Sequence, residues 1–205
     1  MLRTTIFFLA MVVTATQRFE PARVASAQIG EIPYRTAAAA VVGVELTVDA
    51  RGSVTNVRDL VDVEPFTGVL RDSASRWTFN PARGGNQRVD SHVLVAGVFR
   101  PAMLMFPKPD APREVDAQPS DEVPFPTSLE VPNYPPNAIG SAYVLVEVEV
   151  GDTGSVMSAK TITESSGFDG AALQAARAWT FRAASHEGRP APGFVYIVFA
   201  FRQPQ

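Results

Sequence analysis

The sequence contains no cysteine. This absence excludes disulfide bonds, thiolate metal sites, a cysteine nucleophile and the lipid anchor of bacterial lipoproteins. Histidine is also scarce: only His92 and His186 occur, and a lone histidine in a loop or strand is more often structural than catalytic. A phosphate-binding glycine loop, a metal-ligand cluster and a nucleophile elbow are missing as well. The sequence therefore predicts a protein that is not an enzyme, with no catalytic residue, metal site, cofactor or small-molecule substrate.

The chain also lacks an excess of charge of either sign. Its net charge is -3 and its pI is near 5.4, so electrostatics give no reason to expect nucleic acid or an anionic membrane surface as a partner. The apolar fraction of 46% with 19% charged residues is typical of a globular protein. A length of 205 residues accommodates one large domain or two small ones.

A long apolar run is absent too. Ile6 to Val13, preceded by Arg3, is the N-terminal apolar stretch, and it is shorter than the roughly 20 residues that span a bilayer. The tripeptide Ala25-Ser26-Ala27 then predicts signal-peptide cleavage before Gln28. We therefore expect a signal peptide over residues 1–27 and an exported protein. The alternative is an uncleaved segment that anchors the protein in the inner membrane.

An internal repeat dominates what remains. A shift of 102 positions aligns residues 33–100 with 135–202 without a gap, and it superimposes Trp77-Thr78-Phe79 on Trp179-Thr180-Phe181. Such self-similarity predicts a duplicated domain. We expect a first copy over residues 33–100 and a second copy over 131–203. The proline-rich residues 101–130 between them predict an extended, polyproline-like linker, with the apolar island Met103 to Phe106 docking on a neighbouring domain.

The order of elements is the same in both copies. Alternating residues from Val144 to Val150, a glycine-containing turn and a returning strand predict a β-hairpin. Asp169 is the expected N-cap of a helix in which Ala172, Ala176 and Trp179 share one face. The last strand follows at Phe194 to Arg202. The predicted fold is α+β, with two small tandem domains, each a three-stranded antiparallel sheet (β-β-α-β) with a helix packed on one face.

The strand order suggests where a partner binds. For one helix to cover three antiparallel strands, the third strand returns beside the first, so the second and third strands become edges. The third strand is apolar and free of proline, and such an edge is a template for adding another strand. We expect Glu147 and Glu149 on the solvated face of the first strand, with Glu45 equivalent to Glu147.

The second copy resembles the C-terminal domain of the TonB family. The matching residues are Tyr134-Pro135, Ala138, Gly140, Val144 to Val150, Gly154-Ser155-Val156, Ser165 to Asp169, Ala171-Ala172-Leu173, Ala178 to Phe181 and Gly188-Arg189-Pro190. The first copy resembles the family more weakly. The resemblance implies a periplasmic domain that pairs its last strand with an extended peptide, the TonB box of an outer-membrane transporter. It implies these peptide-binding residues: Phe194, Val195, Tyr196, Ile197, Val198, Phe199, Ala200, Phe201, Arg202, Asn133, Tyr134 and Pro135.

Two functional hypotheses follow. In the first, the second copy binds an extended segment of an outer-membrane transporter or another envelope protein by β-strand addition, in a TonB-like role in transport across the outer membrane. In the second, the two copies pair their last strands with each other, as an intrachain pseudo-dimer that leaves this edge closed to a ligand.

Overall fold

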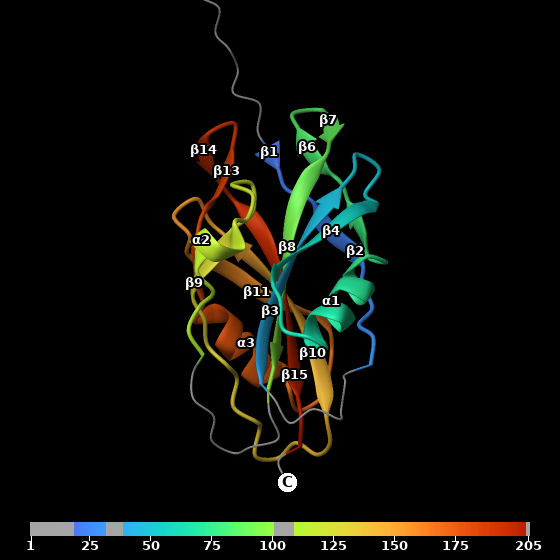
Figure 1. Cartoon of the computed structure of the whole chain (residues 1–205), viewed down its shortest axis with the longest axis vertical. Coiled ribbons are helices and arrows are strands. Elements are labelled where there is room, and N and C mark those ends of the chain that lie inside the picture. Colours follow the sequence, from blue (N-terminus) through green and yellow to red (C-terminus); the bar gives the residue numbers. More distant parts are fainter. Residues whose placement is uncertain (1–18, 32–38, 101–108, 204–205) are drawn as a thin grey trace, which may run out of the picture.

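The computed structural model describes residues 19–31, 39–100 and 109–203 (Figure 1). Its main element is a six-stranded sheet with the order β11-β10-β15-β8-β3-β4. These strands are β3 (Ala40–Val48), β4 (Val54–Val61), β8 (Ser91–Phe99), β10 (Ala142–Val150), β11 (Val156–Thr163) and β15 (Gly193–Phe201). The helices of the described residues are α1 (Phe66–Ala74), α2 (Glu114–Ala117) and α3 (Asp169–Arg177). The protein is therefore α+β, as the sequence predicts.

Short strands complete both halves of the chain. They are β1 (Phe19–Glu20), β2 (Arg23–Ser26), β5 (Thr78–Asn80), β6 (Ala82–Gly84), β7 (Gln87–Val89), β9 (Phe125–Ser128), β12 (Thr180–Arg182), β13 (Ala184–His186) and β14 (Arg189–Ala191). Every strand from β2 to β8 has a counterpart 102 residues later, from β9 to β15. The repeat unit thus includes a strand before the hairpin, β2 or β9, which pairs with β5 or β12 and which the sequence analysis missed.

The helix of each copy packs as the residue spacing predicts. Ala172 and Ala176 are 0% exposed and Trp179 is 1% exposed, so all three lie on the buried face of α3. Asp169 differs from its expected role. It is the first residue of α3, and its carboxylate accepts a hydrogen bond from the N–H of Ser165 at 2.9 Å, which closes the preceding turn instead of capping the helix.

The two last strands lie side by side at the centre of the sheet. β15 pairs with β8 in parallel, from Val195 opposite Leu94 to Ala200 opposite Phe99, whereas the other pairs in this sheet are antiparallel. Parallel neighbours from two similar units are related by a half-turn about an axis along the strands, which exchanges the faces of the sheet. The two helices therefore lie on opposite sides of it, as Figure 1 shows for α1 and α3.

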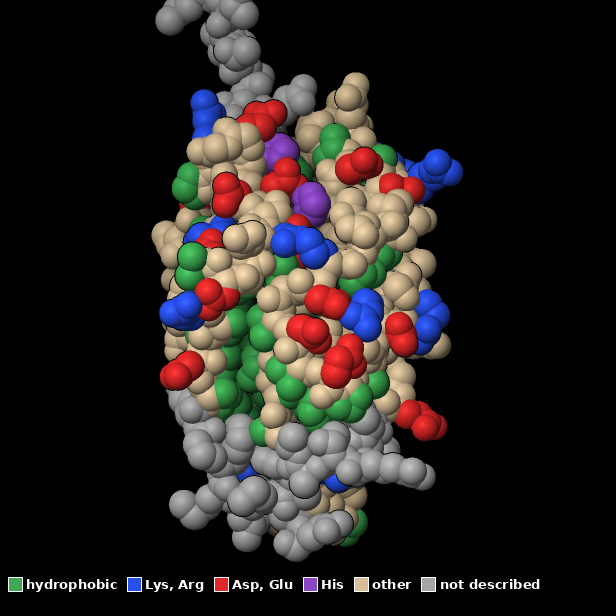
Figure 2. All heavy atoms as spheres, viewed as in Figure 1, with side chains coloured by type: hydrophobic (Ala, Val, Ile, Leu, Met, Phe, Trp, Pro, Cys, Tyr) green, Lys and Arg blue, Asp and Glu red, His purple; other side chains and the backbone are tan. Residues whose placement is uncertain are grey.

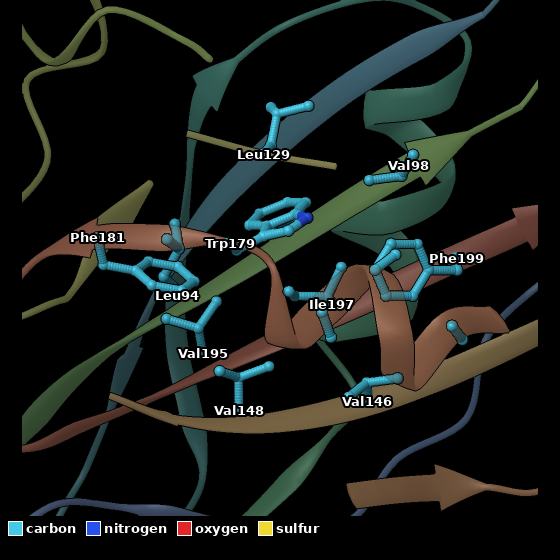
Figure 3. Close-up of a cluster of buried hydrophobic side chains, with 14 of the residues drawn as sticks. Leu94, Val98, Leu129, Val146, Val148, Trp179, Phe181, Val195, Ile197 and Phe199 are labelled. Carbon is cyan, nitrogen blue, oxygen red and sulfur yellow. The ribbon is translucent and has the colours of Figure 1, made fainter. Parts of the chain in front are cut away.

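Each copy contributes to the core of the other. Leu94 and Val98 of the first copy lie in one cluster with Trp179 and Ile197 of the second (Figure 3). On the opposite face, Tyr196 of the second copy packs in the cluster that contains the first tryptophan, Trp77. The expectation of two separate domains is therefore wrong. The physical reason is that both last strands are apolar on both faces, and one helix covers only one face.

Part of the expected linker is folded. Residues 109–133, which we name the second arm, contain α2 and β9, and they bury Val123, Phe125 and Leu129 against the second copy. An extended, independent linker is therefore wrong for residues 109–130. The prolines are tolerated because β9 pairs only with the three-residue strand β12, so few of its N–H groups are needed. Met103 to Phe106 lie outside the described residues.

Residues 19–31, which we name the first arm, belong to the fold of the first copy. β1 pairs with β6, β2 pairs with β5, and Ala22 is 2% exposed. The indole Nε1 of Trp77 donates a hydrogen bond to the carbonyl of Gln28 at 2.9 Å. Cleavage before Gln28 would remove β1 and β2, so the predicted end of the signal peptide conflicts with the structure. The apolar run from Ile6 to Val13 lies outside the described residues, and no helix among the described residues has the length and apolarity to cross a bilayer.

Candidate functional site

The predicted peptide-binding strand lies in the middle of the sheet. β15 pairs with β10 over its whole length, from Gly193 opposite Val150 to Phe201 opposite Ala142, and it pairs with β8 on its other side. The expectation that this strand is an edge is therefore wrong. The edges of the six-stranded sheet are β11 and β4.

Burial explains why β15 is not an edge. No side chain from Val195 to Phe201 is more than 3% exposed, on either face of the sheet. Phe194 is half-buried at the start of the strand, and Arg202 follows its end. An edge position would leave the face opposite α3 uncovered, whereas pairing with β8 brings the first copy over it. Continuous hydrophobicity along this strand thus indicates two covered faces.

The other predicted contact segment, Asn133 to Pro135, lies at the C-terminal end of β15. The Tyr134 hydroxyl donates to the carbonyl of Gly140 at 2.8 Å. The ring of Phe168 lies 5.6 Å from that of Tyr134 and 5.0 Å from that of Phe201, so it connects the segment with the strand. Pro135 accepts a hydrogen bond from the N–H of Ala138, and Asn133 is exposed.

A buried carboxylate joins the first arm to the second copy. Glu147 is 3% exposed, although the sequence analysis placed it on a solvated face. Nη2 of Arg23 donates to its Oε1 at 2.7 Å, the Tyr196 hydroxyl donates to its Oε2 at 3.1 Å, and the ammonium of Lys160 lies 3.3 Å away. The same hydroxyl accepts the N–H of Val24, and burial raises the pKa of Tyr196. The first arm covers this face of β10, which accounts for the difference.

The equivalent residue of the first copy, Glu45, is held in a similar way by the second arm. Its carboxylate lies 2.6 Å from Nη2 of Arg58 and 2.8 Å from Nδ1 of His92, and it accepts the N–H of Ser120 at 3.0 Å. Burial alone raises the pKa of Glu45, but the bonds from His92 and Ser120 and the charge of Arg58 lower it overall. The hydrogen bond to Glu45 raises the pKa of His92 against the effect of desolvation.

The two glutamates therefore connect each copy to the arm of the other. Sequence analysis did not find this role, although it noted that Glu45 and Glu147 are equivalent. The available signal was a charged residue repeated in the middle of an apolar strand in both copies, where an unpaired carboxylate is costly. On the face drawn in Figure 2, acidic and basic side chains are interspersed.

A groove lies between the second arm and α3. Its volume is about 260 Å³. The extended segment from Glu130 to Asn133 forms one wall, and the helix side presents Ala171, Gln174, Ala175 and Ala178. The indole Nε1 of Trp179 donates to the carbonyl of Glu130 at 2.9 Å and fixes this wall to the end of the helix. Of the predicted site residues, Asn133 lines the groove.

The comparison with known families agrees with the segment that the resemblance covers. Residues 130–202 match the family described as Gram-negative bacterial TonB protein C-terminal. Over this segment the chain is similar to the TonB C-terminal family. TonB C-terminal domains are non-enzymatic parts of envelope proteins that take part in transport in Gram-negative bacteria. No curated protein and no solved structure matches the chain.

Proposed function

We propose that this chain is an exported, non-enzymatic TonB-like envelope protein that acts as one closed module of two copies. The observation that carries the proposal is the parallel pairing of β15 with β8, which fills the side of β15 where a guest strand would add. The partner is an extended segment of an outer-membrane transporter or another envelope protein. It binds on the outside of the module, and β15 stays paired with β8.

Energetics favour the closed module over a guest strand at β15. A guest can replace the main-chain hydrogen bonds of β8, because these ask little of side chains. It cannot easily replace the apolar cover: Leu94, Ala96 and Val98 on one face of β8 are at most 4% exposed and pack in the cluster that contains Trp179. Burying each large aliphatic side chain contributes about 1.5 to 3 kcal/mol. Separation of the copies would also break the ion pair of Glu147 with Arg23 of the first arm and the hydrogen bond from the N–H of Ser120 in the second arm to Glu45.

Strand addition to Phe194–Arg202 is the second candidate. The observation in its favour is that the half containing β15 is the one that matches the TonB family. In this mechanism β8 occupies the position of the envelope peptide in the free protein. It separates from β15 before the peptide pairs with that strand. The two candidates differ in one measurable property, which is whether the partner requires β15 and β8 to separate.

An engineered disulfide tests this difference. Ala96 and Ile197 are register partners on β8 and β15, and neighbouring strands bring paired Cα atoms within the range of about 4.4 to 6.8 Å that a disulfide needs. The natural chain has no cysteine, so the variant A96C/I197C forms only this bond. The probes are overlapping synthetic peptides that cover the periplasm-facing segments of the outer-membrane transporters of the same bacterium.

The closed module predicts that a peptide bound by the natural protein binds the oxidised variant with unchanged affinity. Strand addition at β15 predicts a loss of at least tenfold on oxidation and recovery with reductant. That loss would overturn the proposed closed module. The natural protein with and without reductant is the matched control, and thermal unfolding of both forms verifies that the variant is folded.

A further inference from the structure

The edge strand β11 has an open outer side in the part of the chain that the structure describes. It pairs with β10 alone, and among the described residues its main chain forms no other hydrogen bond. Its residues are exposed or half-buried, Met157 is 68% exposed, and the strand contains no proline. An edge of this kind accepts another strand through its main chain.

Two rows of polar side chains end at this edge. In the pairing of β10 with β11, Glu149 lies opposite Ser158 and Glu147 lies opposite Lys160, and both rows share one face because residues two apart in a strand point the same way. The Ser158 hydroxyl donates to Oε2 of Glu149 at 2.9 Å. The half-exposed ammonium of Lys160 lies 3.3 Å from Oε1 of Glu147. One row therefore ends in a hydroxyl beside a carboxylate, and the next ends in a cation.

These rows complement each other when two molecules pair β11 with β11, antiparallel, about a two-fold axis at Ala159. Residues equally far from Ala159 then lie opposite each other, so Lys160 of one molecule faces Ser158 of the other. Its flexible side chain reaches over that serine to Glu149 of the other molecule, while it keeps Glu147 of its own. An axis at Lys160 would oppose two lysines, so charge selects the register at Ala159.

The helix α3 borders the same edge, because it packs over β10 and β11, the two outermost strands of this half. The second arm lies on the other side of the helix. Leu129 of this arm packs in one cluster with Leu94 and Val98 of β8 (Figure 3), and Ala171 and Ala178 line the groove between arm and helix. The opposite side of α3 therefore faces the open edge of β11.

That side of α3 carries Asp169, Leu173 and Arg177, which recur every four residues. A helix midway between β10 and β11 lies one strand spacing, about 4.8 Å, from the axis, so the helices of two paired molecules come within about 10 Å. Helices that pack on each other are about 8 to 10 Å apart. With Leu173 at the axis, the leucines meet and Arg177 of each molecule lies opposite Asp169 of the other.

The other edge of the sheet, β4, has different residues at the deciding positions. Thr47 is the equivalent of Glu149, so the corresponding row does not end beside a carboxylate. Arg71 is the equivalent of Leu173, so a two-fold axis there would place two arginines at its centre instead of two leucines. Of the two edges, β11 is therefore the one that fits a second molecule.

We propose that two molecules of this protein form a symmetric dimer by antiparallel pairing of their β11 strands and packing of their α3 helices. The dimer joins the two sheets into one, and it covers Met157 opposite Thr161 of the other molecule. A two-fold interface uses the same surface of both molecules, so association through β11 stops at the dimer. This inference goes beyond the proposed function, because β15 stays paired with β8 and the envelope partner plays no part in it.

Single cysteines test the register. The natural chain has no cysteine, so a disulfide of Ala159→Cys joins two molecules. Paired Cα atoms in an antiparallel ladder lie about 4.5 to 5.5 Å apart, within the range of a disulfide. We expect mild oxidation to convert this variant into a covalent dimer. Thr161→Cys is the matched control, because its two cysteines lie about 14 Å apart, four residues along the strand, and it should not crosslink.

Sedimentation velocity on uncrosslinked proteins tests the helix contact. Arg177→Glu opposes two carboxylates at each end of the stripe, and Leu173→Arg installs the equivalent residue of the first copy. Each should raise the dimer dissociation constant at least tenfold. Arg76→Glu makes the same change of charge at an exposed position after α1 and should leave the constant unchanged. Thermal unfolding verifies that every variant is folded.

Four results would overturn the proposed dimer. The first is a natural protein that remains monomeric at about 0.1 mM. The second is equal crosslinking of Ala159→Cys and Thr161→Cys. The third is assembly that grows beyond two molecules, which would indicate pairing of β11 with β4. The fourth is a monomer whose β11 amide resonances shift with a transporter peptide, which would assign this edge to the envelope partner.

Discussion

Arg23 and Glu147 form an ion pair of 2.7 Å, although 124 residues separate them in the chain. Arg23 belongs to β2 in the first arm, and Glu147 belongs to β10 in the second copy. Cζ of Arg23 also lies 5.0 Å from the ring centroid of Phe194. The arm of the first copy therefore helps to hold the second copy in place.

Replacement of Arg23 by leucine should lower the free energy of unfolding by about 1 to 3 kcal/mol, because a buried carboxylate loses its closest partner. The loss is smaller than for a fully isolated charge, since Lys160 and the hydroxyl of Tyr196 still contact Glu147. Urea unfolding followed by tryptophan fluorescence measures it. Arg51→Leu is the control, because Arg51 pairs with Asp49 at 3.9 Å on the surface and should cost less than about 0.5 kcal/mol. Equal effects at both positions would contradict the buried linkage.

The mature protein should retain the first arm. A chain that begins at Gln28 lacks β1 and β2, loses the buried Ala22 and leaves Glu147 without Arg23. We expect it to be less stable than a chain that begins at Phe19 by about 3 kcal/mol or more. Mass spectrometry of the exported protein locates the natural N-terminus. A mature protein that starts at Gln28 and unfolds at the same urea concentration as the longer chain would contradict this prediction.

The contact between His92 and Glu45 should make stability depend on pH. The folded-state pKa of His92 is raised above its usual value of 6.5 by the hydrogen bond to Glu45. A raised pKa means that the contribution is fully present below pH 6.5 and is lost as the pH rises through the folded pKa. The difference in unfolding free energy between the natural protein and His92→Gln should therefore be constant below about pH 6.5 and shrink between about pH 6.5 and about pH 8.5.

A double-mutant cycle checks the origin of this pH dependence. In the background Glu45→Gln, only the desolvation of His92 remains of these two effects, so the change caused by His92→Gln should no longer shrink as the pH rises over the same range. Glu45 itself has a lowered pKa, so its own contribution is lost only at acidic pH, below the window of the experiment. A pH dependence that persists without the Glu45 carboxylate would assign the effect to another group.

Local elements were predictable from residue spacing. The alternation from Val144 to Val150 gave the hairpin strand, and the spacing of Ala172, Ala176 and Trp179 gave the buried face of α3. These predictions succeed because strand and helix periodicity are decided by which side chains face the core. The offset of 102 residues then transfers each element from one half to the other.

Residue spacing did not predict how the two halves of the chain are arranged relative to each other. The sequence analysis interpreted the uniformly apolar β15 as an edge strand to which a partner strand adds. Uniform hydrophobicity in a strand indicates cover on both faces, but it does not say which segment provides the cover. β8 is also apolar on both faces. Its pairing with β15 brings each copy over the face that the helix of the other copy leaves uncovered. The two arms showed no clear period of apolar residues, so β2 and β9 were also missed.

The groove could not be predicted from the sequence. The copies differ beside it, with glycine and serine at residues 30 and 73 and proline and alanine at residues 132 and 175. The consequence of this difference becomes clear only from the structure, in which the N–H of Gly30 donates a hydrogen bond to the Ser73 hydroxyl. Asn133 was assigned to the site from the resemblance, and it lines the groove.

Gly154 provides a test of the turn that both hairpins share. Its φ is +82°, and a Cβ atom there would lie 2.0 Å from the carbonyl oxygen of Phe181, a backbone atom that has no room to retreat. The N–H of Phe181 donates to the carbonyl of Gly154 at 3.0 Å, so the turn is fastened to the strand after α3. Gly154→Ala should therefore cost about 3 kcal/mol or more, from the clash and the left-handed backbone together.

Gly140→Ala separates these two causes. Gly140 has a similar φ of +86°, but a Cβ atom there would meet nothing within 4 Å. Its substitution should cost only about 1 to 2 kcal/mol, because only the backbone term remains. Urea unfolding of both variants measures the difference, and Gly52→Ala, at the equivalent turn with a Cβ-to-oxygen distance of 1.9 Å to Phe79, should behave like Gly154→Ala. If Gly154→Ala and Gly140→Ala were equally destabilising, the close approach of the turn to Phe181 would not contribute to stability.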